Sequence, residues 1–145
     1  MKKKGSRSER ELFHLLWEHY GPCVRSAGSG STTKPSPDLI ASNGSRVLAI
    51  ECKSTKAKKL YFPPKEINEL ILFSNSFNAE AWLAVRFDNK GWYFILAENL
   101  TKTKGESFSI SYPELLEKGL IFEELIGKYK QNKIDGKKDN LGKND

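Results

Sequence analysis

The chain has 145 residues, of which 38% are hydrophobic, and this combination suits one compact domain with a buried core. No apolar run approaches the roughly 18 to 20 residues that a membrane-spanning helix needs, and the basic start MKKKGSRSERE lacks the apolar segment of a signal peptide. We therefore expect a cytoplasmic protein with no membrane partner. The formal net charge of +6 favours a polyanionic partner.

The apolar spacing predicts a helix, three strands, a second helix, two strands and a final helical region. SRSERELFHLLWEHYG has helical spacing, CVRSA reads as a short strand, and GSGSTTKPSP reads as a loop. Strands at residues 38–42 and 46–53 then flank an Asn-Gly turn, and a Pro-Pro pair opens the second helix. EAWLAVRF and GWYFILA form a second hairpin, and SYPELLEKGLIFEELIGKYK forms one or two helices broken near Gly119. The order predicts an α/β domain.

Composition separates this domain from the end of the chain. We expect residues 1–130 to form a single domain and residues 131–145 to form a basic tail. The tail, QNKIDGKKDNLGKND, is nearly free of apolar residues, which predicts disorder. Such a tail either keeps the chain soluble or tethers nucleic acid loosely.

Two acids and a lysine stand in the first expected hairpin, where folding alone would favour apolar residues. Alternation puts Ala49, Glu51 and Lys53 on one face of the second strand. A two-residue type I′ turn would place Asp38 opposite Ala49 and diagonal to Glu51, about 7 to 8 Å away and within reach of a shared cation. A three-residue loop would place Asp38 on the other face. The simpler alternatives are a solvated strand face for Glu51 and Lys53 and an ordinary turn role for Asp38.

A third acid lies in the first helix. At 100° per residue, Glu9 falls in the middle of the apolar stripe that contains Leu12 and Leu16, so it points toward whatever the helix packs on. Acids are rarely tolerated in such a position without a partner. The alternative is a capping box, in which Glu9 reaches back to Ser6 at the start of the helix.

Converging carboxylates and a lysine, without histidine or thiolate, suit a hard divalent cation with oxygen ligands, most naturally Mg²⁺. Cys23 and Cys52 lack the spacing of zinc ligands, and we expect both to be reduced and buried, with no side-chain chemistry. A bound cation polarises a phosphoryl oxygen and activates a water, while a nearby lysine stabilises developing charge. Phosphodiester hydrolysis is therefore the leading hypothesis.

The pattern resembles a known signature. SPD, followed thirteen residues after its Asp by ECK, resembles the PD-(D/E)xK motif of restriction-endonuclease-like nucleases. The segments KKGSRSERELFHLL, VRSAGSGS, PDLIA, IECKS and LYF look like the archaeal Holliday junction resolvases of the Hjc type, and the resemblance runs from about Lys4 to Leu96. It implies a restriction-endonuclease-like fold with a central mixed five-stranded sheet flanked by helices.

The resemblance also implies roles for individual residues. Asp38 and Glu51 match the metal-binding pair, and a backbone carbonyl near Cys52 and the carboxylate of Glu9 are further candidate ligands. We expect Mg²⁺ as the cofactor, with Mn²⁺ able to substitute for it. The full set matched to catalytic positions comprises Glu9, Arg10, Arg25, Ser31, Asp38, Glu51 and Lys53. The loop before the Pro-Asp pair differs in composition from the family pattern, so Ser29 is an alternative to Ser31.

Basic residues flank the expected site in the chain and predict contacts to DNA phosphates. They are Lys2, Lys3, Lys4, Arg7, Lys34, Lys56, Lys58 and Lys59. GSGSTTK lacks the Gly-Lys-Ser/Thr ending of a nucleotide P-loop, so we do not interpret it as one. Four-way junction DNA is the expected substrate, and no small-molecule substrate is expected. The resemblance implies a homodimer that acts on four-way junction DNA, and two sites in one particle suit paired cuts. The aromatic side chains Trp82, Phe87, Trp92, Phe94 and Phe122 are candidates for the dimer interface, with core packing as the alternative.

The sequence thus predicts an enzyme that resolves four-way junctions in homologous recombination and repair, in the cytoplasm and associated with the nucleoid. One alternative is another nuclease of the same superfamily, acting on ends, flaps or modified DNA. A second is a non-catalytic nucleic-acid-binding module whose acids merely balance its lysines. The complete set of Glu9, Asp38, Glu51 and Lys53 argues against the second alternative.

Overall fold

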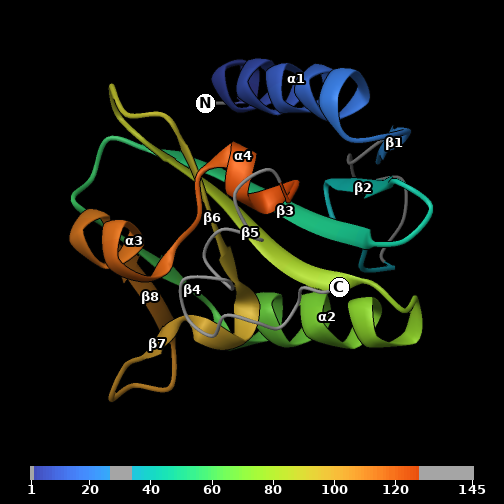
Figure 1. Cartoon of the computed structure of the whole chain (residues 1–145). Coiled ribbons are helices and arrows are strands. Elements are labelled where there is room, and N and C mark those ends of the chain that lie inside the picture. Colours follow the sequence, from blue (N-terminus) through green and yellow to red (C-terminus); the bar gives the residue numbers. More distant parts are fainter. Residues whose placement is uncertain (1, 27–33, 128–145) are drawn as a thin grey trace, which may run out of the picture.

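The structure, a computed structural model, describes residues 2–26 and 34–127, with side chains from residue 7 onward. Figure 1 shows a central sheet between two helices, α1 (Lys2–His19) over one face and α2 (Pro64–Ser76) over the other. The predicted role of Ser31 and the tail at residues 131–145 lie outside the described residues. No helix in the described part of the chain is long and apolar enough to cross a membrane.

The central sheet has five strands in the order β1-β2-β3-β5-β6. The pair β3 and β5 is parallel, joined by a crossover through α2, and the other neighbouring pairs are antiparallel. These are the five strands that the sequence predicts, and their directions confirm a mixed sheet. Their bounds are β1 Cys23–Arg25, β2 Leu39–Ser42, β3 Val47–Thr55, β5 Glu80–Phe87 and β6 Trp92–Leu96.

Apolar side chains cover both faces of this sheet, because successive residues of a strand point to opposite sides. On one face, Leu12 and Leu16 of α1 pack in a cluster with Ile50 of β3. On the other face, Ile67 of α2 packs in a second cluster with Ala49 of β3. The alternation predicted for β3 is therefore confirmed, and Glu51 continues the side that faces α2.

A second, three-stranded sheet has the order β4-β8-β7 and packs into the cluster on the α2 side. The sequence does not predict these strands, because β7 has only two residues and β4 starts in a lysine-rich segment. The final helical region is broken at Gly119, as expected, into α3 and α4. The bounds are β4 Lys59–Phe62, β7 Thr101–Lys102, β8 Phe108–Ser111, the 3₁₀ helix η1 Ala97–Asn99, α3 Tyr112–Lys118 and α4 Phe122–Leu125.

The first hairpin turns through four residues, 43–46, so the expected two-residue turn is wrong: Ser42 pairs with Val47. The side-chain oxygen of Asn43 closes the loop by accepting hydrogen bonds from the N–H groups of residues 45 and 46, at 2.9 and 2.8 Å. Continuing the register by one pair sets Asp38 directly opposite Glu51. A shift of two residues preserves the face of each side chain, so the two acids still share the side predicted for them.

Helix α1 begins at Lys2, four residues before the expected cap, so the capping-box explanation of Glu9 is wrong. Glu9 lies in the interior of this helix, where its N–H is part of the regular hydrogen-bond ladder. The remaining explanation is that the carboxylate is directed at the sheet on which α1 packs.

The aromatic side chains of the second hairpin belong to the core and not to a dimer surface. Trp82, Phe87, Trp92 and Phe94 are all buried, and Phe122 packs against the cluster on the α1 side. They are numerous because both faces of β5 and β6 are covered, so inward-facing positions occur on both sides of each strand.

Candidate active site

The end of the β2–β3 hairpin brings Asp38 and Glu51 together. The backbone carbonyl of Asp38 accepts a hydrogen bond from Ser26 at 2.9 Å, which fixes its main chain beside β1. Its carboxylate Oδ2 accepts the backbone N–H of Cys52 at 2.8 Å. The side chain of Asp38 is thus held against the backbone of β3, next to Glu51.

Glu9 reaches the same end of the sheet from α1. Its Oε2 accepts a hydrogen bond from Nε of Arg25, the last residue of β1, at 3.1 Å. Burial raises the pKa of Glu9, the negative charge of Asp38 adds to the rise, and Arg25 opposes it. The first helix therefore contributes an acid and β1 contributes its counter-ion, as expected for a site that includes both.

Lys53 lies on the face of Glu51 and forms an ion pair with Glu66 of α2, Nζ to Oε2, at 2.8 Å. Burial works to lower the pKa of Lys53, but the hydrogen bond to Glu66 and the charges of Glu66, Glu51 and Asp38 outweigh it and raise the pKa. Lys53 is therefore positively charged at neutral pH.

Glu66 is a site residue that the sequence interpretation missed. It starts an i, i+4, i+7 series with Leu70 and Phe73 on α2, and all three line one cavity. An acid in line with the apolar side chains of a helix is also the signal that singles out Glu9, and it is available in the sequence for Glu66.

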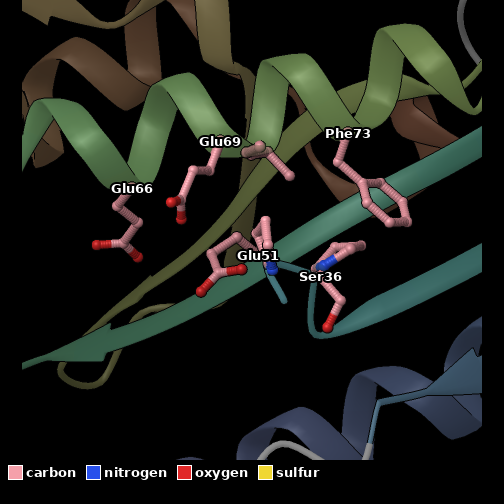
Figure 2. A pocket seen from close by; sticks show the side chains of 8 residues that line it. Ser36, Glu51, Glu66, Glu69 and Phe73 are labelled. Carbon is pink, nitrogen blue, oxygen red and sulfur yellow. The ribbon is translucent and has the colours of Figure 1, made fainter. Parts of the chain in front are cut away.

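This cavity, of about 100 Å³, opens between the segment before β2 and helix α2 (Figure 2). In Figure 2, Glu66 and Glu69 extend from the helix toward Glu51 on the strand, and Ser36 forms the opposite wall. Its full lining is Pro35, Ser36, Pro37, Glu51, Glu66, Glu69, Leu70 and Phe73.

Burial and neighbouring negative charges raise the pKa values of Glu51 and Asp38. Burial, followed by the charges of Asp38 and Glu66, raises the pKa of Glu51 to about 8. Burial also raises the pKa of Asp38, although the Cys52 N–H and the charge of Lys53 oppose the rise. A bound cation would favour the ionised form of these carboxyl groups and so lower their pKa values again.

The oxygen atoms of Asp38 and Glu51 suit Mg²⁺, which needs few protein ligands, better than a metal ion whose ligands all come from protein side chains. Within residues 2–26 and 34–127, no three His, Cys, Asp or Glu side chains form a group that could hold a metal ion. Mg²⁺ usually keeps several waters and is bound through one or two carboxylates, which matches Asp38 and Glu51. Cys23 and Cys52 are free thiols, as expected; Cys23 is buried, but Cys52 is only partly buried, so the expected burial is wrong for Cys52.

The structure describes the side chains of only some of the predicted DNA-binding residues, and those side chains are exposed. The side chains of Lys2, Lys3 and Lys4 lie outside the described residues, although their backbone forms the start of α1. Arg10, in the next turns of α1, is exposed. The remaining basic residues of the prediction are all exposed: Arg7, Lys34, Lys56, Lys58 and Lys59.

A mixed sheet covered by helices on both faces, with two carboxylates and a lysine at the end of one hairpin, defines a restriction-endonuclease-like α/β fold. A profile of the family "Archaeal holliday junction resolvase (hjc)" matches residues 1–134. The chain therefore belongs to the archaeal Holliday junction resolvase family.

Individual relatives agree with this assignment. The crossover junction endodeoxyribonuclease Hjc of Archaeoglobus fulgidus is 38% identical over 140 residues, covering 94% of this chain and 99% of that protein. The Methanocaldococcus jannaschii protein of the same name is 36% identical over 133 residues, covering 92% of this chain and 94% of the relative. The solved structure of Archaeoglobus fulgidus Hjc, a Holliday junction resolvase, superposes with a TM-score of 0.78 at 35% identity, covering 85% of this chain and all of that one.

Proposed function

We propose that this chain is a crossover junction endodeoxyribonuclease, which resolves four-way DNA junctions by paired phosphodiester hydrolysis on opposed strands. One observation carries the proposal: Asp38 and Glu51 face each other at the end of the hairpin, with Lys53 two residues further on the same face. The curated relatives, which match over nearly their whole length, are named for the same activity. The setting is homologous recombination and repair on nucleoid DNA in the cytoplasm.

The reaction depends on Mg²⁺, with Mn²⁺ as a substitute. Asp38 and Glu51 would hold the cation with their carboxylates, and the backbone carbonyl of Cys52 would serve as a further protein ligand. When bound, the cation supplies a polarised phosphoryl oxygen and an activated water. Glu9 is the further candidate ligand, and the hydrogen bond that its Oε2 accepts from Arg25 holds its carboxylate at this end of the sheet.

The side chains of the chain itself position the reacting groups. The Cys52 N–H holds the Asp38 carboxylate in one orientation, which reduces the entropy lost when the cation and DNA bind. Lys53, which keeps its proton at neutral pH, stabilises the negative charge that develops on the phosphate or orients the attacking water. The products carry a 5′-phosphate and a 3′-hydroxyl. Arg10 and Ser31 remain predicted participants.

Exposed basic side chains provide the contact to DNA. Lys56 and Lys58 lie directly after β3, the strand that carries Glu51 and Lys53, so a phosphate backbone bound there passes close to the cavity. Lys59 extends this basic segment and lies over the ring of Tyr61.

The chain works as a homodimer, because two opposed strands require two sites in one particle. Two exposed apolar side chains, Leu72 of α2 and Phe77 just after this helix, support this: they are 68% and 52% exposed. Phe73 stacks on Phe77 with ring centres 5.2 Å apart and also lines the cavity, so a second copy on this face would border the active site. Sedimentation equilibrium should give a dimer for the wild type and a monomer for Leu72→Glu combined with Phe77→Glu; an unchanged dimer would place the interface elsewhere.

Cleavage of a labelled immobile four-way junction, compared with a matched linear duplex, tests the proposal. We expect symmetric nicks on opposed strands of the junction with Mg²⁺ and none with EDTA. Equal cutting of duplex and junction would indicate a broader nuclease of the same superfamily. Tight binding without any cut, with Mg²⁺ or Mn²⁺, would indicate a non-catalytic DNA-binding module.

A further inference from the structure

The ammonium group of Lys53 is held in place from another element of the fold. The backbone of Lys53 is fixed in β3 opposite Val85 of the parallel strand β5, but its side chain has four rotatable bonds. Its Nζ donates to Oε2 of Glu66 at 2.8 Å, and the two side chains are only 35% and 26% exposed. A partner at this distance selects one position from the many that a lysine side chain can adopt.

The fold makes Glu66 a firm partner. Ile67, the next residue, is fully buried, and Leu70, one turn further on, is 5% exposed, so this part of α2 is anchored on the sheet. The N–H of Glu66 donates to the carbonyl of Pro63 at 3.1 Å, which places the acid in the first turn of the helix. The positive end of the helix dipole favours a carboxylate there.

We propose that Glu66 is a positioning residue of the cleavage reaction. It holds the ammonium of Lys53 beside Glu51, where negative charge develops on the scissile phosphate, so the lysine needs no reorganisation when the junction binds. Glu66 itself touches neither the phosphate nor the attacking water. This inference rests on the proposed nuclease function, and it assigns a role to a residue outside the PD-(D/E)xK signature.

The neighbouring acid Glu69 provides a matched control. It lines the same cavity, lies one turn further along α2, and carries the same charge. Its ion pair, however, is with Lys65, at 3.7 Å. Replacing either acid removes one carboxylate from the lining of the cavity, whereas only the replacement of Glu66 removes the partner of Lys53.

The kinetic test compares Glu66→Ala, Glu66→Gln and Glu69→Ala in single-turnover cleavage of the junction with Mg²⁺, beside junction binding in EDTA. For Glu66→Ala we expect the cleavage rate to fall about 10- to 100-fold while the junction Kd stays within about threefold. Glu66→Gln should retain more activity, because its side-chain oxygen still accepts from Lys53, and Glu69→Ala should stay within about twofold. Wild-type cleavage by Glu66→Ala, an equal loss for Glu69→Ala, or a matching loss of junction binding would overturn the proposal.

A second test needs no cleavage. A double-mutant cycle of Lys53→Ala and Glu66→Ala, measured by urea unfolding in EDTA, should be non-additive, whereas the cycle of Lys53→Ala and Glu69→Ala should be additive. An additive first cycle would refute the pairing on which the proposal depends. If the wild type cut no junction at all, the proposed function would fail, while this cycle would still report whether Glu66 holds Lys53.

Discussion

The buried carboxyl of Glu51 should make the metal-free fold sensitive to pH. Burial, reinforced by the charges of Asp38 and Glu66, raises its pKa from 4.5 to about 8. In the unfolded chain the pKa is near the ordinary value of about 4.3, so between these values the folded state binds one more proton. The stabilising contribution of this proton is complete below the unfolded pKa and is lost as the pH rises toward 8. The loss amounts to about 1.4 kcal/mol for each pH unit.

The substitution Glu51→Gln removes this titration while keeping the shape of the side chain. From about pH 6 to about pH 7.5, the variant should gain about 2 kcal/mol in free energy of unfolding relative to the wild type, one proton over one and a half pH units. Urea unfolding in EDTA at several pH values measures the difference, and unchanged m-values show that the two unfolding reactions expose similar surface. Parallel pH profiles for the two proteins would refute the reasoning.

Three further predictions concern the site, the DNA surface and the fold. Asp38→Asn should keep the folded structure and the hydrogen bond from the Cys52 N–H. It should lower the junction cleavage rate, measured with Mg²⁺ at saturating enzyme, at least about 100-fold, and a wild-type rate would exclude Asp38 as a metal ligand. Replacing Lys56 and Lys58 by Ala should weaken junction binding and reduce the slope of log K against log salt by about 2, as titrated by fluorescence anisotropy; an unchanged slope would remove both from the DNA contact. Gly21→Ala should lower the melting temperature markedly, because a Cβ there would lie 2.1 Å from the carbonyl oxygen of Ser42. Calorimetry measures the melting temperature, and an unchanged value would mean that the backbone moves to accommodate the Cβ.

The sequence could predict those parts of the site that depend on strand alternation. Glu51 and Lys53 share a face because side chains two residues apart always do, whatever the turn. Asp38 was placed on the correct face although the turn length was wrong, because four residues instead of two shift the register by an even number. The direct opposition of the two acids, however, depends on the hydrogen bonds of Asn43, which favour a longer loop.

The parts that the sequence could not predict depend on packing between distant elements. The spacing on α2 marks Glu66, but its ion pair with Lys53 depends on the crossover that places α2 over the end of β3. The two-residue strand β7 has too few residues for any periodicity to show. The aromatic content of β6 does not by itself distinguish a dimer surface from a core, and Trp92 and Phe94 are buried because both faces of the sheet are covered.

The most direct test of this account is the location of the metal. An anomalous difference map from crystals grown with Mn²⁺ should show a peak contacted by the carboxylates of Asp38 and Glu51. Crystals of Asp38→Asn grown under the same conditions should lack that peak. A peak at another acidic cavity, such as the one lined by Glu80, Glu98 and Glu124 at the other end of α2, would contradict the assignment of the active site. So would the absence of a Mn²⁺ peak near Asp38 in a protein that cuts junctions with Mn²⁺.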